Sequence, residues 1–142
     1  MHTNPSDEEL KTLLTNARTI AVVGASGNPE KASYGIMQRL QNVGYHVIPV
    51  NPREIEVLGE KSYPSLSDIP GAVDIVDVFR RAEDTPPIAD EAAKIGAKVL
   101  WLQSGISNED TAARAKAGGL TVVMDACLAT AHALLRVPRK PR

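Results

Sequence analysis

The sequence has 142 residues, of which 43% are hydrophobic and 23% charged, values typical of one globular domain. Sixteen basic residues against 17 acidic residues leave a net charge of −1, so we expect no general attraction to nucleic acid or to an anionic membrane. The N-terminus is polar and acidic, and no apolar run reaches the roughly 20 residues that span a bilayer. The chain therefore predicts a single domain over residues 1–142, with a loose tail at 136–142.

The cysteine and histidine content excludes further classes of protein. Cys127 is the only cysteine, so no internal disulfide can form, which favours the reducing cytoplasm. His2, His46 and His132 are scattered and show no spacing typical of metal ligands. We therefore expect no metal site.

Short apolar segments alternate with amphipathic segments, which is typical of parallel α/β architecture. Ser6 is predicted to cap the first helix, ahead of three acidic residues. The interval 53–70 contains too many helix breakers for a helical crossover, so we expect only an extended piece at 61–63 and a helical turn at 65–68. Strands are predicted at 19–23, 46–50, 73–79, 98–102 and 120–124, and the later helices at 33–43, 85–95, 108–117 and 128–135.

This order of elements predicts a Rossmann-like, doubly wound parallel sheet of five strands in a three-layer α/β/α domain. With right-handed connections, the expected strand order is 3-2-1-4-5, numbered along the chain. A ligand of such a sheet lies beyond the carboxyl ends of the strands, where the strand order switches. The loops that follow the strands therefore supply the candidate binding residues.

The turn after the first strand is the strongest local signal. Gly24 permits a sharp exit from the strand, and the small Ala25 and Ser26 leave backbone N–H groups accessible to a phosphate at the start of a helix. The alternative is a glycine that only makes a tight turn. Because Gly24 and Gly27 lack the G-x-G-x-x-G spacing, the turn is not a full dinucleotide fingerprint.

The second strand ends in Asn51-Pro52-Arg53, without the acidic residue that holds the ribose of NAD. Arg53 favours a phosphorylated ribose, which both NADP and CoA carry, and Lys31 is another candidate phosphate partner. Ordinary surface charge is the alternative for both cations. These residues count against NAD and leave NADP and CoA open.

Three further strand ends supply candidates, each with a structural alternative. Phe79 could pack on an adenine or in the core, and Arg80 could flank a nucleotide or lie in solvent. The segment 103–106 (Gln103, Ser104, Gly105, Ile106) offers backbone access to a ligand, although a helix cap explains part of it. Cys127 either approaches the cleft or is a small buried residue, and no general base accompanies it.

Assembled in order, these segments resemble the family of CoA-binding proteins whose fold matches the CoA-binding domain of the succinyl-CoA synthetase α subunit. The resemblance is carried, in chain order, by Val22-Val-Gly-Ala-Ser26 with Pro29, Gly44-Tyr-His-Val-Ile-Pro-Val-Asn-Pro52, Asp74-Ile-Val-Asp-Val-Phe79, Trp101-Leu-Gln-Ser-Gly-Ile106, and Val122-Val-Met-Asp125 with Cys127.

The resemblance implies that the turn at 24–26 receives the CoA pyrophosphate and that 51–53 lies by the adenosine phosphate. It also implies that Val78, Phe79, Arg80 and 103–106 line the path of the nucleotide and pantetheine, with Cys127 near the thiol. Ala126 and Ala131 depart from the family pattern, because single-domain members often have a basic and an acidic residue there.

The sequence thus predicts non-enzymatic binding of coenzyme A or acyl-CoA by a carrier, sensor or regulatory module. The second domain of the synthetase, with its phosphorylated histidine, has no counterpart here, so we expect no ligase chemistry from this chain alone. The alternative is an NADP-dependent oxidoreductase or NADP-binding regulator. A homodimer remains open, and no protein partner is identified.

Overall fold

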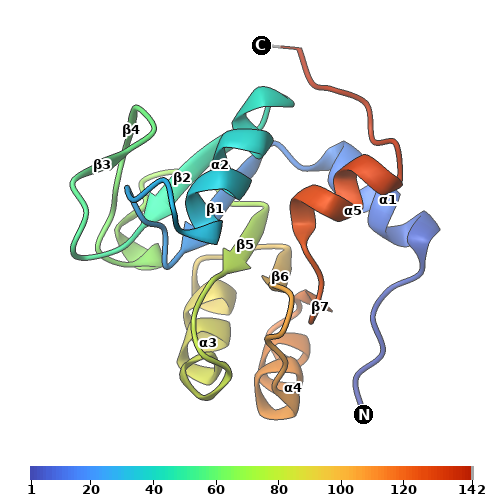
Figure 1. Ribbon diagram of the computed structural model, residues 1–142. Helices are drawn as coiled ribbons and strands as arrows, with labels where there is room; N and C mark the ends of the chain where they lie inside the picture. The colour runs from blue at the N-terminus through green and yellow to red at the C-terminus, as the bar shows by residue number, and fades with distance from the viewer. Residues whose placement is uncertain (142) are drawn as a thin grey trace.

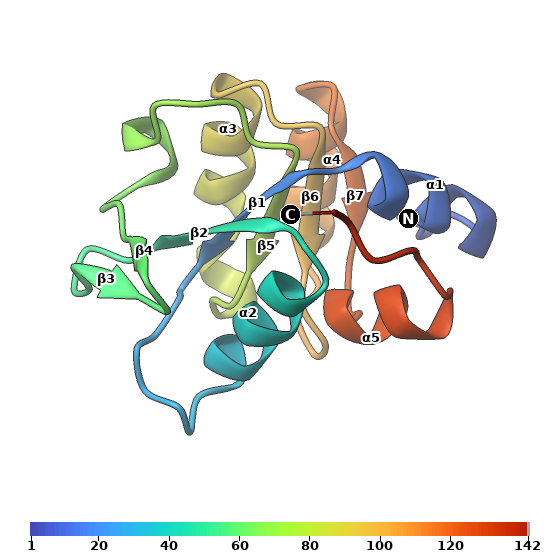
Figure 2. The same ribbon diagram turned by 90° about the horizontal axis from the view of Figure 1, so that it is seen from above.

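The computed structural model, described here for residues 1–141, is a parallel sheet between two layers of helices (Figures 1 and 2). The α1, α2 and α5 helices cover one face and α3 and α4 cover the other. The Rossmann-like α/β fold class predicted from the sequence is therefore confirmed. The sheet strands are β1 (Thr19–Val23), β2 (His46–Val50), β5 (Ile75–Val78), β6 (Val99–Leu102) and β7 (Thr121–Val123), and the helices are α1 (Asp7–Asn16), α2 (Ala32–Asn42), α3 (Pro86–Lys94), α4 (Glu109–Ala117) and α5 (Leu128–Leu134).

Local chemistry explains where these elements begin. The side chain of Ser6 accepts a hydrogen bond from the Glu9 N–H, and the Glu9 carboxylate accepts one from the Ser6 N–H, so α1 starts with a capping box. Prolines at the start of α3 remove an N–H that a first turn would leave unpaired. The strands are almost continuously buried, as expected of parallel strands covered on both faces.

The strand order differs from the predicted one. The observed order is β2-β1-β5-β6-β7, which is 2-1-3-4-5 for the five long strands in chain order, so the expected order 3-2-1-4-5 was wrong. β5 pairs with β1 rather than with β2, and the carboxylate of Asp74 just before it accepts the Arg18 and Thr19 N–H groups at 2.8 and 3.0 Å. The switch of strand order therefore lies between β1 and β5.

The crossover from β2 to β5 explains this order. It holds the short hairpin β3 (Glu56–Val57) and β4 (Glu60–Lys61) and the 3₁₀ turn η1 (Leu66–Asp68). Tyr63 of this segment bonds the outer edge of β2, donating to the Pro49 carbonyl at 3.1 Å and accepting from the Asn51 N–H at 2.9 Å. The crossover thus takes the place beside β2 that the predicted order assigned to the third strand.

The C-terminal segment after α5 packs against the helices, whereas its composition predicted a loose tail. Val137 is buried, and the Lys140 N–H donates to the Val43 carbonyl at 2.8 Å. The Lys140 ammonium donates to the Thr15 carbonyl and lies 5.1 Å from the centroid of the Tyr45 ring. Position 142 of this predicted tail lies outside the described residues.

Among residues 1–141, no helix is both long and apolar enough to cross a membrane. The same part of the chain holds no group of three His, Cys, Asp or Glu side chains placed to hold a metal ion.

Candidate ligand site at the carboxyl edge of the sheet

A hollow of about 430 Å³ opens at the carboxyl edge of the sheet, where β1 and β5 end side by side. It brings together the turn after β1, the start of α2, and the loops after β2 and β5. The hollow is therefore at the switch of strand order, the place where open α/β sheets bind ligands. Its lining residues are Gly24, Ser26, Lys31, Ala32, Ser33, Asn51, Arg53, Phe79 and Arg80.

The turn between β1 and α2 is shaped by Gly24. This glycine has a φ of +87°, and a side chain there would collide with the carbonyl of Phe79. The neighbouring Ala25 is fully buried in the core under α2 and α5, while its carbonyl accepts a hydrogen bond from Asn51 Nδ2 at 2.7 Å. Gly24 thus lets the backbone approach β5 closely, and Ala25 and Asn51 hold the turn in place.

The start of α2 lacks a cap. Its N-cap residue, Lys31, makes no side-chain capping bond, and the first turn contains no acidic residue. Ser33 in that turn is only 4% exposed and lines the hollow, yet its hydroxyl has no hydrogen-bond partner among residues 1–141. The helix dipole and the unpaired N–H groups of a first turn favour an anion at this position.

Three cations surround this helix start. Lys31 and Arg53 are exposed and Arg80 is partly buried, and all three line the hollow. None of them forms an ion pair within the described part of the chain, although six ion pairs occur elsewhere in it. The hollow therefore combines a helix N-terminus with three cations that form no ion pair in the described structure.

The hollow unites the seven predicted site residues Gly24, Ser26, Lys31, Asn51, Arg53, Phe79 and Arg80. Other predicted residues lie apart from its lining. Val78 is fully buried against α3 and α4, and Ala25 is fully buried on the other face of the sheet. Pro52 is exposed beside the hollow without lining it.

The segment 103–106 also lies outside the hollow, and its backbone has partners. The Gly105 N–H donates to Asp125 Oδ1 at 2.6 Å, and the Ile106 N–H donates to the Gln103 carbonyl at 2.9 Å. Ser104 is exposed, and Cys127 is a half-buried residue at the start of α5. These residues share the carboxyl edge of the sheet with the hollow but do not line it.

Asp77 in β5 is a buried carboxyl close to this edge. Its Oδ1 accepts a hydrogen bond from the Gln103 side-chain amide, and its Oδ2 has no partner in the described structure. Burial raises the pKa of Asp77 to about 7. The Gln103 side-chain amide is thus used in a buried hydrogen bond to Asp77.

Three residues near the hollow were missed by the sequence interpretation. Ala32 and Ser33 open α2, and Glu54 accepts a hydrogen bond from the Gly27 N–H at 2.6 Å. An alanine and a serine in a first helical turn are unremarkable in sequence, and only burial without a partner distinguishes Ser33. In the sequence, Glu54 looks like any surface carboxylate. Its hydrogen bond to Gly27 depends on how the fold brings the two loops together.

The layered fold and its edge hollow define a Rossmann-like α/β domain of the kind that accepts a ligand at a strand-order switch. Residues 18–133 match the family model described as CoA binding domain, and the chain belongs to this family. The family resemblance found in the sequence is thereby confirmed.

The chain is similar both to proteins of about its own length and to part of a longer ligase subunit. The Bacillus subtilis protein described as uncharacterized protein YneT is 44% identical over 133 residues, covering 94% of this chain and 98% of that protein. The solved structure of a hypothetical protein from Pyrococcus horikoshii has a TM-score of 0.90 at 38% identity and covers 96% of this chain and 99% of that one. The alpha subunit of ADP-forming acetate–CoA ligase II from Pyrococcus furiosus is 49% identical over 61 residues, which cover 42% of this chain but 13% of that subunit.

Proposed function

We propose that this chain binds coenzyme A or acyl-CoA in the hollow and acts as a carrier, sensor or regulatory module rather than as a catalyst. The observation that carries the proposal is the uncapped start of α2, with its unpartnered Ser33 hydroxyl, facing three cations that have no acidic partner. Membership of the CoA binding domain family supports CoA as the anion that fits there.

Each part of the ligand has a matching surface in this proposal. The turn at Gly24–Ser26 and the start of α2 receive the pyrophosphate, because helix N-termini and exposed N–H groups stabilise phosphate oxygens. Arg53 pairs with the 3′-phosphate, for which a guanidinium offers bidentate hydrogen bonds. The half-buried ring of Phe79 supplies apolar surface for the adenine or the pantetheine arm.

Recognition without catalysis is proposed because the buried titratable side chains and Cys127 lie outside the lining of the hollow. Asp77 and His132 are buried outside the lining of the hollow, and burial lowers the pKa of His132. Cys127 also lies outside that lining. The acetate–CoA ligase subunit is far longer than this chain, so its activity gives no reason to assign ligase chemistry here.

Calorimetric titration with CoA, dephospho-CoA, NADP and NAD tests the proposal. We expect saturable binding of CoA, weaker binding of dephospho-CoA, and no comparable binding of NAD. Tight binding of NADP with no heat from CoA would replace the proposal with the NADP-binding alternative, which the same cations would serve.

The Arg53→Ala variant tests whether Arg53 pairs with the 3′-phosphate. It should weaken CoA binding about tenfold, the value of one charge-assisted contact, while leaving dephospho-CoA almost unaffected. Lys94→Ala, which removes an exposed cation at the end of α3, is the matched control and should bind like the wild type. Equal losses for both ligands in Arg53→Ala would refute the pairing of Arg53 with the 3′-phosphate.

A further inference from the structure

Side chains tie together the two loops that border the hollow. Asn51 Nδ2 donates to the Ala25 carbonyl at 2.7 Å, and the Gly27 N–H donates to Glu54 Oε2 at 2.6 Å. Both bonds join the turn after β1 to the loop after β2. The second bond, from the Gly27 N–H to the Glu54 carboxylate, is here called the Glu54 clasp.

A turn in the backbone brings Glu54 to this position. The Glu54 N–H donates to the Asn51 carbonyl at 3.2 Å, and the Arg53 N–H donates to Asn51 Oδ1 at 2.9 Å. A methyl group at Gly27 would lie 3.4 Å from each carboxylate oxygen of Glu54, so the two residues pack closely. The same short loop thus presents Arg53 to the hollow and Glu54 to the glycine turn.

The Glu54 carboxylate is engaged by backbone rather than by the nearby cations. Within residues 1–141 it forms no ion pair, although Lys31, Arg53 and Arg80 all line the adjacent hollow. A negative charge beside a site for a polyanion opposes binding through Coulomb repulsion. The Glu54 carboxylate therefore contacts the turn through its hydrogen bond from the Gly27 N–H.

We infer that Glu54 is a positioning residue that holds the turn between β1 and α2 in the shape that receives phosphate, and that binding uses its hydrogen bond and not its charge. This inference rests on the proposed function, because it concerns the same hollow. Without the clasp, the turn would have to be ordered when the ligand binds, and that ordering cost would reduce the affinity.

Titration of CoA into Glu54→Ala and Glu54→Gln tests the inference. Glu54→Ala should bind up to about tenfold more weakly, as for loss of one hydrogen bond. Glu54→Gln keeps an acceptor and removes the charge, so it should bind at least as tightly as the wild type. Glu56→Ala and Glu56→Gln remove a nearby exposed carboxylate with no side-chain partner in the described structure, and therefore control for charge.

Two results would overturn the inference: wild-type affinity in Glu54→Ala, or an equal loss in Glu54→Gln and Glu54→Ala. Hydrogen exchange of the Gly27 amide gives a second measurement, made without ligand. Exchange should be faster in Glu54→Ala and near the wild-type rate in Glu54→Gln, and identical rates in all three would refute the clasp. A wild type that fails to bind CoA would overturn the proposed function, whereas the clasp is judged by this exchange.

Discussion

Helices α2 and α4 begin at the same edge of the sheet, on opposite faces, and their first turns are built differently (Figure 2). In α4 the Asn108 side chain accepts the Thr111 N–H at 3.0 Å, and Glu109 and Asp110 complement the helix dipole. The α2 helix begins after Lys31 with neither a side-chain cap nor an acidic residue. The protein thus compensates one helix start with its own side chains and leaves the other uncapped.

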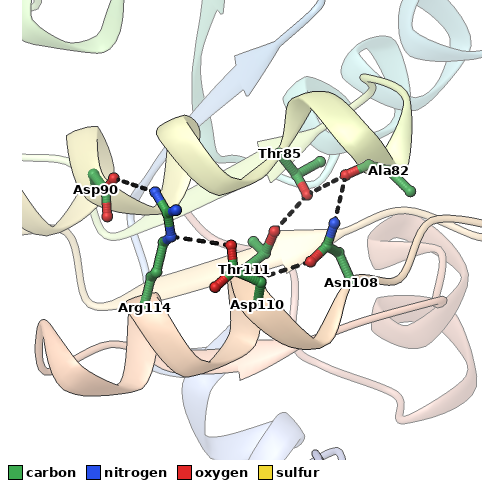
Figure 3. Close-up of polar contacts among 7 residues, drawn as sticks. All are labelled: Ala82, Thr85, Asp90, Asn108, Asp110, Thr111 and Arg114. Atoms are coloured by element: carbon green, nitrogen blue, oxygen red, sulfur yellow. Dashed lines mark hydrogen bonds and ion pairs between the residues drawn. The ribbon is translucent and has the colours of Figure 1, made fainter.

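The residues around the N-termini of α2 and α4 differ in the same way. Figure 3 shows the side chains that link α4 to α3, where the Thr85 hydroxyl donates to the Ala82 carbonyl and therefore accepts from the Thr111 hydroxyl at 2.6 Å. Arg114 bridges Asp90 and Asp110 at 2.8 and 3.2 Å.

At α2 the corresponding groups are unpaired. The Ser33 hydroxyl and the cations around it have no partner within residues 1–141. A helix dipole is present at both starts, so the dipole alone does not identify a site. The two starts differ instead in their side chains, because α4 is capped by Asn108 and the start of α2 has no side-chain cap.

The largest expected effect comes from substituting the glycines of the two turns. Gly24→Ala should lower the free energy of unfolding by about 2–4 kcal/mol and abolish CoA binding, because the new methyl group collides with the Phe79 carbonyl. Gly105→Ala meets no atom within 4 Å, so at its φ of +82° it should cost only about 1–2 kcal/mol and keep CoA affinity. Urea denaturation and calorimetry measure both, and equal effects of the two variants would contradict the contrast.

A smaller effect is expected from removing one hydroxyl at each helix start. Ser33→Ala should leave stability nearly unchanged, because its hydroxyl has no partner in the described structure, and should weaken CoA binding about tenfold. Thr111→Val should do the reverse, lowering stability by about 1–2 kcal/mol through the lost bond to Thr85 while CoA affinity stays constant. The account fails here if Ser33→Ala destabilises the fold and spares binding.

A further effect depends on pH and concerns Asp77, in the core between the two turns. The Asp77 carboxyl ionises near 3.8 when unfolded, whereas burial raises its pKa to about 7 in the folded chain. Between these values the folded state holds the extra proton, so the Asp77 contribution to stability falls as pH rises. Urea denaturation from pH 4 to 8 should show this loss in the wild type and not in Asp77→Asn. Parallel profiles would refute it.

The sequence predicted the elements well and their lateral arrangement badly. Continuous apolar runs such as 19–23 and 46–50 identify buried parallel strands, and the bounds agree with β1 and β2. The order failed because pairing of β5 with β1 depends on the non-helical crossover, in which Tyr63 bonds the outer edge of β2. Apolar periodicity carries no information on that contact.

The predicted site residues divide between the hollow and the neighbouring loops for a structural reason. Residues directly after β1, β2 and β5 converge in the hollow because adjacent parallel strands end together. Residues 103–106 do not line the hollow. The Gly105 N–H instead donates to Asp125, a residue distant in the sequence. Ser33 was not predicted because its position in the lining of the hollow is a property of the folded chain.

Amide chemical shifts of the ¹⁵N-labelled protein during a CoA titration test most directly that the ligand binds at the start of α2. We expect the largest shifts at Ser26, Ala32 and Ser33, and small shifts at Gly105 and Asn108. Shifts confined to residues 104–108, with the start of α2 unchanged, would contradict it.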